Sequence, residues 1–300
     1  MENVVISKIC GLCAGCKRAI TVAEEELKKG KAVTIFKEIV HNKTVNNHLK
    51  NLGAVFADNI NDLSPNSTII IRAHGEPPET YNYLKQNNIS FKDCTCPNVE
   101  NIHKAVQEYS KNGYHIILLG KFHKAVHPEV VGTIGWANGK EILIETNEDL
   151  ESLNDLKNSK VYLVCQTTFN MKAADDLIAK IEIICSKNNN ELIVNKSICS
   201  AQKSINISSQ ELAKNSDLMI VVGGKNSSNS LELFNNIKTL CPSIFIEDIN
   251  TYKQALKEIN FKLNKNTRVG ITAGASTMKE ELEVLKKNIE NDLLGESLWI

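Results

Sequence analysis

Short apolar runs alternate along the chain with amphipathic segments, and this alternation predicts the secondary structure. The runs are rich in Val, Ile and Leu and show little alternation between apolar and polar positions. Continuous apolar runs of this length are typical of parallel strands that are covered on both faces. We therefore expect strands at residues 4–9, 32–36, 68–72, 115–119, 161–165, 218–222 and 269–272, with a shorter strand at 90–91.

Helical patterns lie between these runs. Residues 21–29, for example, place Ala23 and Leu27 on one face of a helix. Similar patterns predict helices at residues 98–111, 171–188, 228–240 and 278–291. Strands that alternate with helices indicate an α/β protein with parallel sheets. A length of 300 residues suggests two or three compact units.

The composition narrows the class of protein. Apolar residues make up 42% of the chain, which is enough for a sizeable core, and Lys plus Arg equals Asp plus Glu at 35 each. A net charge of zero argues against a general nucleic-acid binder. The start of the chain carries no targeting signal, and no stretch approaches the length that spans a bilayer, so we expect a cytoplasmic protein without a membrane partner. We expect a monomer, because no repeat or coiled-coil pattern is present.

The nine cysteines are many for such a chain. Their odd number and the reducing compartment argue against a disulfide framework. Cys165, Cys185 and Cys241 lie in apolar stretches and fit a role as small buried residues. The spacing of Cys10, Cys13 and Cys16 is similar to part of a ferredoxin-type cluster run, but neither a fourth ligand nor a Cys-Pro ending follows nearby.

A second interpretation takes one cysteine from each of three distant places, Cys13, Cys96 and Cys199. Each follows a strand or begins a helix, where backbone N–H groups and the helix dipole favour a thiolate. Three thiolates on a four-iron cluster leave one iron open to a substrate. Zinc is the alternative metal, with nitrogen ligands available from His41, His74, His123 and His127, although no Cys/His pair has zinc-finger spacing.

Polar residues gather where the predicted strands end, which is where open α/β sheets bind ligands. Three histidines at such places, His41, His74 and His127, can bind a phosphate or pass protons. The small and hydroxyl residues of 223–230 and 273–276 can cradle a phosphate at a helix start, although turns favour such residues anyway. Glu129 is either a helix N-terminal charge or a proton source whose pKa is raised by an enclosed site.

The ordered set of motifs resembles the 4-hydroxy-3-methylbut-2-enyl diphosphate reductase (LytB-type) family over almost the whole chain. The motifs are Gly11-Leu12-Cys13-Ala14-Gly15 with Arg18-Ala19, Val40-His41-Asn42, Ala73-His74-Gly75, Thr95-Cys96-Pro97 with His103, His127-Pro128-Glu129-Val130, Gln166-Thr167-Thr168, Ile198-Cys199, Ser227-Ser228-Asn229 and Ala273-Gly274-Ala275-Ser276.

This resemblance implies a trefoil of three α/β lobes with parallel sheets around a central cluster. We expect lobes at residues 14–96, 97–198 and 199–300, the last completed by 1–13. It implies one 4Fe–4S cluster with three cysteine ligands, Cys13, Cys96 and Cys199, and one open iron. Glu129 matches the acid that delivers protons, and Thr167 matches a hydroxyl that orients the substrate and relays them. His41, His74, His127, Ser227, Ser228, Asn229 and Ser276 match the diphosphate pocket, and His127 is also a candidate for the catalytic chemistry.

The implied reaction removes the allylic hydroxyl of 4-hydroxy-3-methylbut-2-enyl diphosphate and gives isopentenyl and dimethylallyl diphosphate, the last step of the non-mevalonate isoprenoid pathway. A ferredoxin or flavodoxin would supply the electrons. Three segments depart from the family pattern: residues 200–206, the longer loop 121–126 and Met278 in place of proline. They motivate a second hypothesis, a paralogous reductase or dehydratase for another small molecule. Further alternatives are a non-catalytic cluster protein that uses Cys10–Cys16 and, more distantly, a zinc hydrolase.

Overall fold

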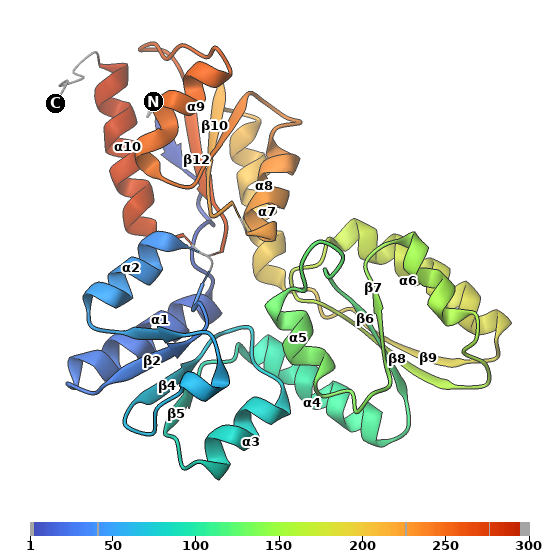
Figure 1. The fold of residues 1–300 in the computed structure, drawn as a ribbon. Helices are drawn as coiled ribbons and strands as arrows, with labels where there is room; N and C mark the ends of the chain where they lie inside the picture. Colours follow the sequence, from blue (N-terminus) through green and yellow to red (C-terminus); the bar gives the residue numbers. More distant parts are fainter. Residues whose placement is uncertain (1–2, 41, 226, 276, 295–300) are drawn as a thin grey trace. The chain divides into compact units, whose positions relative to one another are not determined.

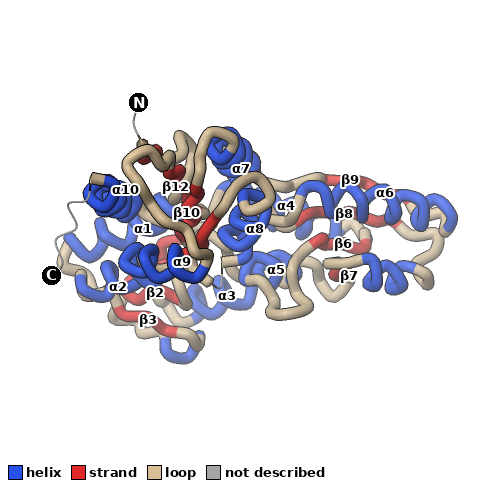
Figure 2. Tube along the Cα trace, turned by 90° about the horizontal axis from the view of Figure 1, so that it is seen from above, coloured by secondary structure: helices blue, strands red, loops and turns tan. Residues whose placement is uncertain are grey.

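The computed structural model describes residues 3–40, 42–225, 227–275 and 277–294, which contain three parallel sheets of four strands each (Figure 1). The predicted α/β class with parallel sheets is confirmed. Figure 2 shows the strands in red with helices in blue beside them. Among the helices of the described ranges, none combines the length and the apolar character that crossing a membrane requires.

Sheet I is built from residues 33–93 in the strand order β3-β2-β4-β5. Its strands are β2 (Val33–Phe36), β3 (Val55–Ala57), β4 (Thr68–Ile71) and β5 (Phe91–Asp93), and the helix α3 (Pro78–Gln86) lies between the last two in sequence. Leu84 of α3 packs into a core cluster with Phe36, Ile69 and Ile71. The central strands β2 and β4 are buried at every position, which explains their unbroken apolar sequence.

Sheet II has the order β7-β6-β8-β9 and is covered on both faces. Along β8, Val161, Leu163 and Cys165 pack against one set of helical residues, while Tyr162 and Val164 pack against another. Successive side chains of a strand point to opposite faces, so both faces are buried. The elements of this sheet are β6 (His115–Leu119), β7 (Glu141–Ile144), β8 (Lys160–Cys165), β9 (Glu191–Asn195), α4 (Pro97–Lys111), α5 (Pro128–Ile134) and α6 (Met171–Lys187).

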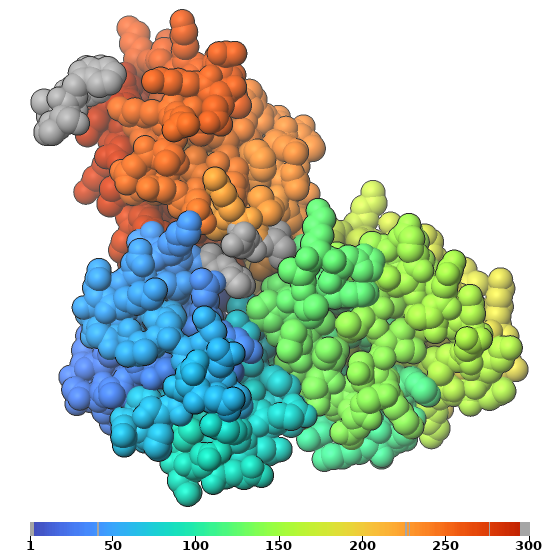
Figure 3. Space-filling view, in the orientation of Figure 1, coloured from blue at the N-terminus to red at the C-terminus, as the bar shows by residue number. Residues whose placement is uncertain are grey.

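Sheet III has the order β1-β12-β10-β11, so the first strand of the chain joins strands from its last third. Residues of α9 and α10 pack on one face of the sheet and residues of α7 and α8 on the other. The space-filling view shows this orange to red part of the chain as closely packed (Figure 3). Its elements are β1 (Val4–Ile6), β10 (Leu218–Val222), β11 (Ser243–Ile246), β12 (Val269–Ala273), α7 (Ser200–Ala213), α8 (Ser228–Ile237), α9 (Tyr252–Glu258) and α10 (Lys279–Leu293).

The contacts within the chain divide it into two compact units. Unit 1 contains Met1–Lys17, Val40–Leu52 and Ser200–Ile300, and therefore sheet III and the helix α2 (Lys43–Asn51). Unit 2 contains Arg18–Ile39 and Gly53–Cys199, and therefore sheets I and II. The helix α1 (Ala14–Lys28) contains the boundary between Lys17 and Arg18. The three lobe boundaries expected from the sequence stay a prediction.

The sequence missed four strands, and all of them lie at the edges of sheets: β3, β7, β9 and β11. Their positions are only partly buried, so they lack the continuous apolar run that marks the central strands. The prediction for α1 was also wrong at its start, because the helix begins at Ala14, directly after Cys13, and not at Thr21. Gly15 in the first turn weakens the helical pattern there.

Candidate functional site

In unit 2, the loop that carries His74 and the loop that carries Cys96 leave neighbouring strands of sheet I. Cys96 donates its backbone N–H to the carbonyl oxygen of Ala73 at 2.9 Å, which ties the two loops together. Cys96 is the N-cap of α4, and Pro97 takes the first helical position, where its missing N–H is not needed. The thiol of Cys96 therefore stands at the positive end of a 15-residue helix.

The two predicted proton-transfer residues lie in contact. The hydroxyl of Thr167 donates to Oε2 of Glu129 at 2.7 Å, and the backbone N–H of Thr167 donates to Oε1 at 2.5 Å. Glu129 lies in the first turn of α5, whereas Thr167 follows β8, so two separate elements of unit 2 meet here. Both carboxylate oxygens are thus held by one residue.

Burial sets the protonation state of this carboxyl group. Only 2% of Glu129 is exposed, and desolvation raises its pKa to about 7, although the two hydrogen bonds from Thr167 act in the opposite direction. No ion pair to Glu129 occurs among the described residues. At neutral pH the carboxyl group is therefore poised between its neutral and ionised forms, as a general acid requires.

Two of the three histidines predicted for the diphosphate pocket also meet in unit 2. The rings of His74 and His127 lie edge to face, with centroids 5.4 Å apart. His127 is the N-cap of α5, and its Nδ1 accepts the backbone N–H of Glu129 at 3.2 Å. In a neutral ring this hydrogen bond leaves the proton on Nε2, which can donate to an anionic oxygen.

Cys199 is connected to the same group of residues. Its backbone N–H donates to the carbonyl oxygen of Thr167 at 2.8 Å, and its Sγ accepts from the side-chain amide of Asn98 at 3.3 Å. Asn98 lies two residues after Cys96, in the first turn of α4. Unit 2 therefore brings together six of the predicted site residues: His74, Cys96, His127, Glu129, Thr167 and Cys199.

Unit 1 holds the loop of Cys13 against the turn that follows β12. The backbone N–H groups of Leu12 and Cys13 donate to the carbonyl oxygens of Thr277 and Ala275, at 2.9 and 3.3 Å. Gly11 has a φ of +77°, and a Cβ there would lie 2.8 Å from the Thr277 carbonyl oxygen, so a larger residue does not fit. This close approach fixes where Cys13 stands before α1.

The turn after β12 also packs against the loop that begins α8. A Cβ on Gly274 would lie 2.1 Å from Oγ of Ser230. Ser227 is the N-cap of α8, and its hydroxyl oxygen accepts from the backbone N–H of Ser230 at 3.4 Å and from its hydroxyl at 3.0 Å. Capping is thus the observed role of Ser227, and Asn229 lies in the first turn of the same helix. His41, Ser276 and the side chain of Ser228 lie outside the described residues.

The three predicted cluster ligands share a structural position that the other cysteines lack. Each directly precedes a helix, α1, α4 or α7, and each is partly exposed, whereas Cys94, Cys165 and Cys185 are buried. The thiol of Cys16 and the backbone N–H groups of Cys16 and Gly15 lower the pKa of Cys13 to about 6. Burial instead raises the pKa of Cys10 to about 11 and that of Cys165 to about 12. Thiols at helix starts suit an iron–sulfur cluster.

The three cysteines are distributed over both units, with Cys13 in unit 1 and Cys96 and Cys199 in unit 2. Within either unit, the described residues contain no group of three or more His, Cys, Asp or Glu side chains placed to hold a metal ion. His123, a nitrogen ligand in the zinc hypothesis, instead contacts Asp149 through Nε2 at 2.8 Å and is 39% exposed.

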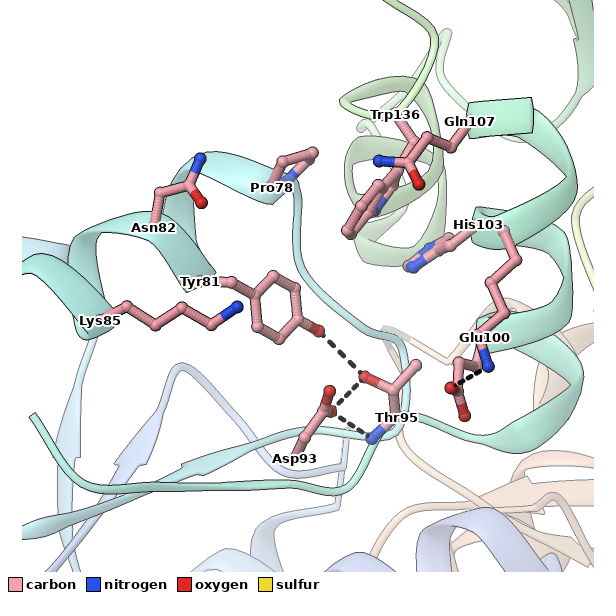
Figure 4. Close-up of a pocket in the computed structure, with 11 residues that line it drawn as sticks. Pro78, Tyr81, Asn82, Lys85, Asp93, Thr95, Glu100, His103, Gln107 and Trp136 are labelled. Carbon is pink, nitrogen blue, oxygen red and sulfur yellow. Dashed lines mark hydrogen bonds and ion pairs between the residues drawn. The ribbon is translucent and has the colours of Figure 1, made fainter. Parts of the chain in front are cut away.

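A pocket of about 400 Å³ lies in unit 2 beside the Cys96 loop (Figure 4). Tyr81 donates to or accepts from the hydroxyl of Thr95 at 3.1 Å, and Thr95 donates to Asp93. His103 stacks on Trp136, with ring centroids 5.6 Å apart. None of the predicted site residues lines this pocket.

Residues 4–290 match the family model described as LytB protein. A curated 4-hydroxy-3-methylbut-2-enyl diphosphate reductase from Aquifex aeolicus (strain VF5) is 37% identical over 301 residues, which cover 99% of each chain. The enzyme of the same name from Clostridioides difficile (strain 630) is 36% identical over 296 residues, covering 96% of this chain and 99% of the relative.

Two solved structures have the same fold. One is described as (E)-4-hydroxy-3-methyl-but-2-enyl diphosphate reductase, the terminal enzyme of the non-mevalonate pathway; it is 34% identical, with a TM-score of 0.72 and coverage of 97% of this chain and 100% of the other. The other is the E-1-hydroxy-2-methyl-but-2-enyl-4-diphosphate reductase from Plasmodium falciparum, 29% identical with a TM-score of 0.82, covering 97% of this chain and 88% of the other. The chain therefore belongs to the LytB protein family, as the resemblance of its motifs predicts.

Proposed function

We propose that this chain reduces 4-hydroxy-3-methylbut-2-enyl diphosphate to isopentenyl and dimethylallyl diphosphate. Its full-length similarity to reductases of that name supports the reaction, and the Glu129–Thr167 pair is the observation that carries it. The reaction breaks the allylic C–O bond and forms a C–H bond. It takes up two electrons and two protons, and the hydroxyl leaves as water.

Glu129 is the proposed proton donor. A carboxyl group with a pKa of about 7 still carries its proton in much of the population at neutral pH and can give it up without a large energetic penalty. Thr167 contacts both carboxylate oxygens, and its hydroxyl can accept a proton from Glu129 while it donates its own to the substrate. Because Glu129 is buried, the transfer takes place away from bulk water.

The diphosphate group is the proposed partner of the remaining polar residues. In unit 2, the Nε2 of His127 is the donor side of the neutral ring, and His74 stands beside it. In unit 1, the start of α8 offers backbone N–H groups and hydroxyls near Ser227 and Asn229. His41, Ser228 and Ser276 complete the proposed set.

The thiols of Cys13, Cys96 and Cys199 are the proposed ligands of one 4Fe–4S cluster. When bound, such a cluster supplies the electrons and Lewis acidity at the one iron without a cysteine ligand. The chain's own contribution is the placement of each thiol at a helix start, where positive dipole ends stabilise thiolates. An external one-electron carrier, a ferredoxin or flavodoxin, is the proposed source of the electrons.

The test is anaerobic purification with iron and sulfide analysis, followed by turnover of 4-hydroxy-3-methylbut-2-enyl diphosphate with a chemical reductant and analysis of the products. The expected result is about four irons per chain and formation of both isopentenyl and dimethylallyl diphosphate. A loaded cluster without turnover would contradict the proposed substrate and favour a paralogous reductase. Residues 200–206 differ from the family pattern and form the first half of α7, so they would then be the first residues to mutate.

A further inference from the structure

The turn that carries His74 is held by a backbone hydrogen bond and by close packing at Gly75. Residues 72–76 leave β4, and Gly75 donates its backbone N–H to the carbonyl oxygen of Arg72 at 3.1 Å. Gly75 has a φ of +71°, and a Cβ there would lie 2.5 Å from Cε1 of His103. The backbone conformation and the packing against His103 therefore both favour glycine at position 75.

A buried ion network spans this turn. Glu76 is 2% exposed, its Oε1 accepts from Nε of Arg72 at 3.1 Å, and its Oε2 accepts from Nζ of Lys37 at 2.9 Å. Arg72 is 5% exposed, and burial lowers its pKa although Glu76 acts against this. Lys37 has a φ of +63°, which is uncommon for a residue with a Cβ. Three charged residues from two strand ends therefore meet across one turn.

The opposite side of the turn packs against α5 and the residues after it. A Cβ on Gly132 would lie 3.2 Å from the carbonyl oxygen of Gly75 and 3.4 Å from that of His74. The indole N–H of Trp136 donates to the carbonyl oxygen of Glu76 at 3.3 Å. Figure 4 shows the ring of Trp136 beside that of His103. Because α5 also carries His127 at its N-cap, the same contacts set the distance between His74 and His127.

Stability alone is a weak reason for such a network. Replacing a buried ion pair by apolar residues is often neutral or stabilising, because the charges lose their hydration. Its value lies in geometry, since a charge-assisted hydrogen bond fixes both the distance and the direction between its partners. Here the charged groups join the two ends of the turn whose middle residue is His74.

We propose that Glu76 is a positioning residue that holds His74 in place for the diphosphate group, through its contacts with Arg72 and Lys37. The proposal rests on the proposed function, because it assigns His74 to the diphosphate. Glu76 forms hydrogen bonds with Arg72, Lys37 and Trp136, so it is proposed to act on the diphosphate through His74. Its loss therefore affects how tightly the diphosphate binds and leaves the proton transfer from Glu129 unchanged.

The experiment compares the anaerobically purified holoenzyme with its Glu76→Gln variant in two measurements. The first is steady-state kinetics with 4-hydroxy-3-methylbut-2-enyl diphosphate, and the second is calorimetric binding of inorganic diphosphate. We expect Glu76→Gln to raise KM and the Kd for inorganic diphosphate about tenfold each, which is the loss of one well-placed charged hydrogen bond. The value of kcat should stay within about twofold, since Glu129 and Thr167 are not changed.

A matched control separates positioning from general destabilisation. Glu26 on α1 is also buried, at 3% exposure, and also bridges two cations, Lys29 at 2.8 Å and Lys31 at 2.6 Å. Glu26→Gln should lower Tm while KM and Kd stay at the wild-type values. Lys37→Gln is the milder second variant, because Lys37 is 31% exposed, and it should raise KM and Kd about threefold even if Glu76→Gln does not fold.

Wild-type values of KM and Kd in both Glu76→Gln and Lys37→Gln would overturn the proposal. Equal changes in Glu76→Gln and Glu26→Gln would overturn it as well, because a merely structural role predicts them. If the wild type fails to turn over the substrate, the proposed function fails. The role of Glu76 is then tested only by the Kd for inorganic diphosphate in the wild type and the variants. A wild type that binds no inorganic diphosphate overturns this inference whatever the turnover shows.

Discussion

The two units differ in the chemistry of the candidate site residues that each of them carries. Unit 2 carries Glu129, whose pKa is raised by burial to about 7, and the paired rings of His74 and His127. Unit 1 provides hydroxyls, backbone N–H groups and one thiol, at the starts of α8 and α1. The proposed proton donor therefore lies in unit 2, whereas the hydroxyls and backbone N–H groups at the start of α8 in unit 1 carry no charge that changes with pH.

The cause of this difference is burial combined with the choice of partners. Glu129 and Glu76 are equally buried, at 2% exposure, and both lie in unit 2. Glu76 contacts two cations, whereas the carboxylate of Glu129 accepts hydrogen bonds from Thr167 alone among the described residues. Burial raises the pKa of Glu129, and its carboxylate has no cationic partner among the described residues that would oppose this rise.

The largest expected effect is the loss of iron, which tests whether Cys13 of unit 1 and Cys199 of unit 2 are both cluster ligands. Cys13→Ser in unit 1 and Cys199→Ser in unit 2 should each abolish turnover and lower the iron content far below that of the wild type. Serine oxygen is a poorer ligand for iron–sulfur clusters than a thiolate. The measurement is iron and sulfide analysis after anaerobic purification.

Cys10→Ser is the matched control, because Cys10 lies near Cys13 in sequence but donates its thiol to the carbonyl oxygen of Ser7. We expect this variant to keep its iron. Loss of iron in Cys10→Ser with retention in Cys199→Ser would instead support a cluster built on the Cys10–Cys16 run within unit 1.

Removing the titrating group of unit 2 should have the next largest effect. We expect Glu129→Gln to lower kcat by roughly 10²- to 10⁴-fold, the usual contribution of a general acid. In the wild type, kcat should fall as the pH rises through about 7, because Glu129 then loses its proton. That limb of the pH profile should be absent from the residual activity of the variant. If kcat of Glu129→Gln still falls at the same pH as in the wild type, the titrating group is not Glu129.

The same substitution should improve stability at high pH. The folded-state pKa of Glu129 is raised from 4.5 to about 7, so the folded protein binds more protons than the unfolded chain between these values. The stability of the wild type therefore falls as the pH rises through this window and stays low above it. Glu129→Gln lacks this loss. Between pH 4 and pH 8, the free energy of unfolding of the wild type should fall by up to about 3 kcal/mol more than that of the variant. Thermal unfolding at the two pH values measures it.

Removing the hydroxyl next to the titrating group should have a smaller effect. We expect Thr167→Val to lower kcat about 10- to 100-fold, because one hydrogen bond to the carboxylate is lost. The loss should also raise the pKa of Glu129 further, so the descending limb of the pH profile should move to higher pH. Thr168→Val is the control, since Thr168 contacts the amide of Gln166 and not Glu129. Identical pH profiles for Thr167→Val and the wild type would separate Thr167 from the proton transfer.

The smallest effect is expected in unit 1. Ser227→Ala should raise KM by at most about tenfold and cost about 1 kcal/mol of stability, because it removes one neutral hydroxyl and the cap of α8. Both changes should be the same at pH 6 and pH 8, since no charge is involved. A pH-dependent change in Ser227→Ala would contradict the division of chemistry between the two units. Steady-state kinetics and thermal unfolding at the two pH values are sufficient.

The sequence by itself determined the central strands, the helices α4, α6, α8 and α10, part of α1, and the places where chemical groups gather. A strand such as β8 is buried on both faces, so its own residues record its environment. The cysteines and histidines at strand ends could also be identified, because the sequence shows where each apolar run ends. The order of these motifs along the chain was enough to predict the family that the comparisons then showed.

Only the tertiary structure decided which side chains meet. Edge strands such as β3 and β11 were not predicted, because they are only partly buried and so lack a continuous apolar sequence. Arg72 and Glu76 flank His74 in the sequence, but their third partner, Lys37, lies 39 residues before Glu76. Glu129 and Thr167 are 38 residues apart, and the raised pKa of Glu129 arises from the burial that folding imposes on this pair. Local patterns predict which segments are buried, whereas the surroundings of one polar side chain, and hence its pKa, depend on residues that only the folded chain brings into contact.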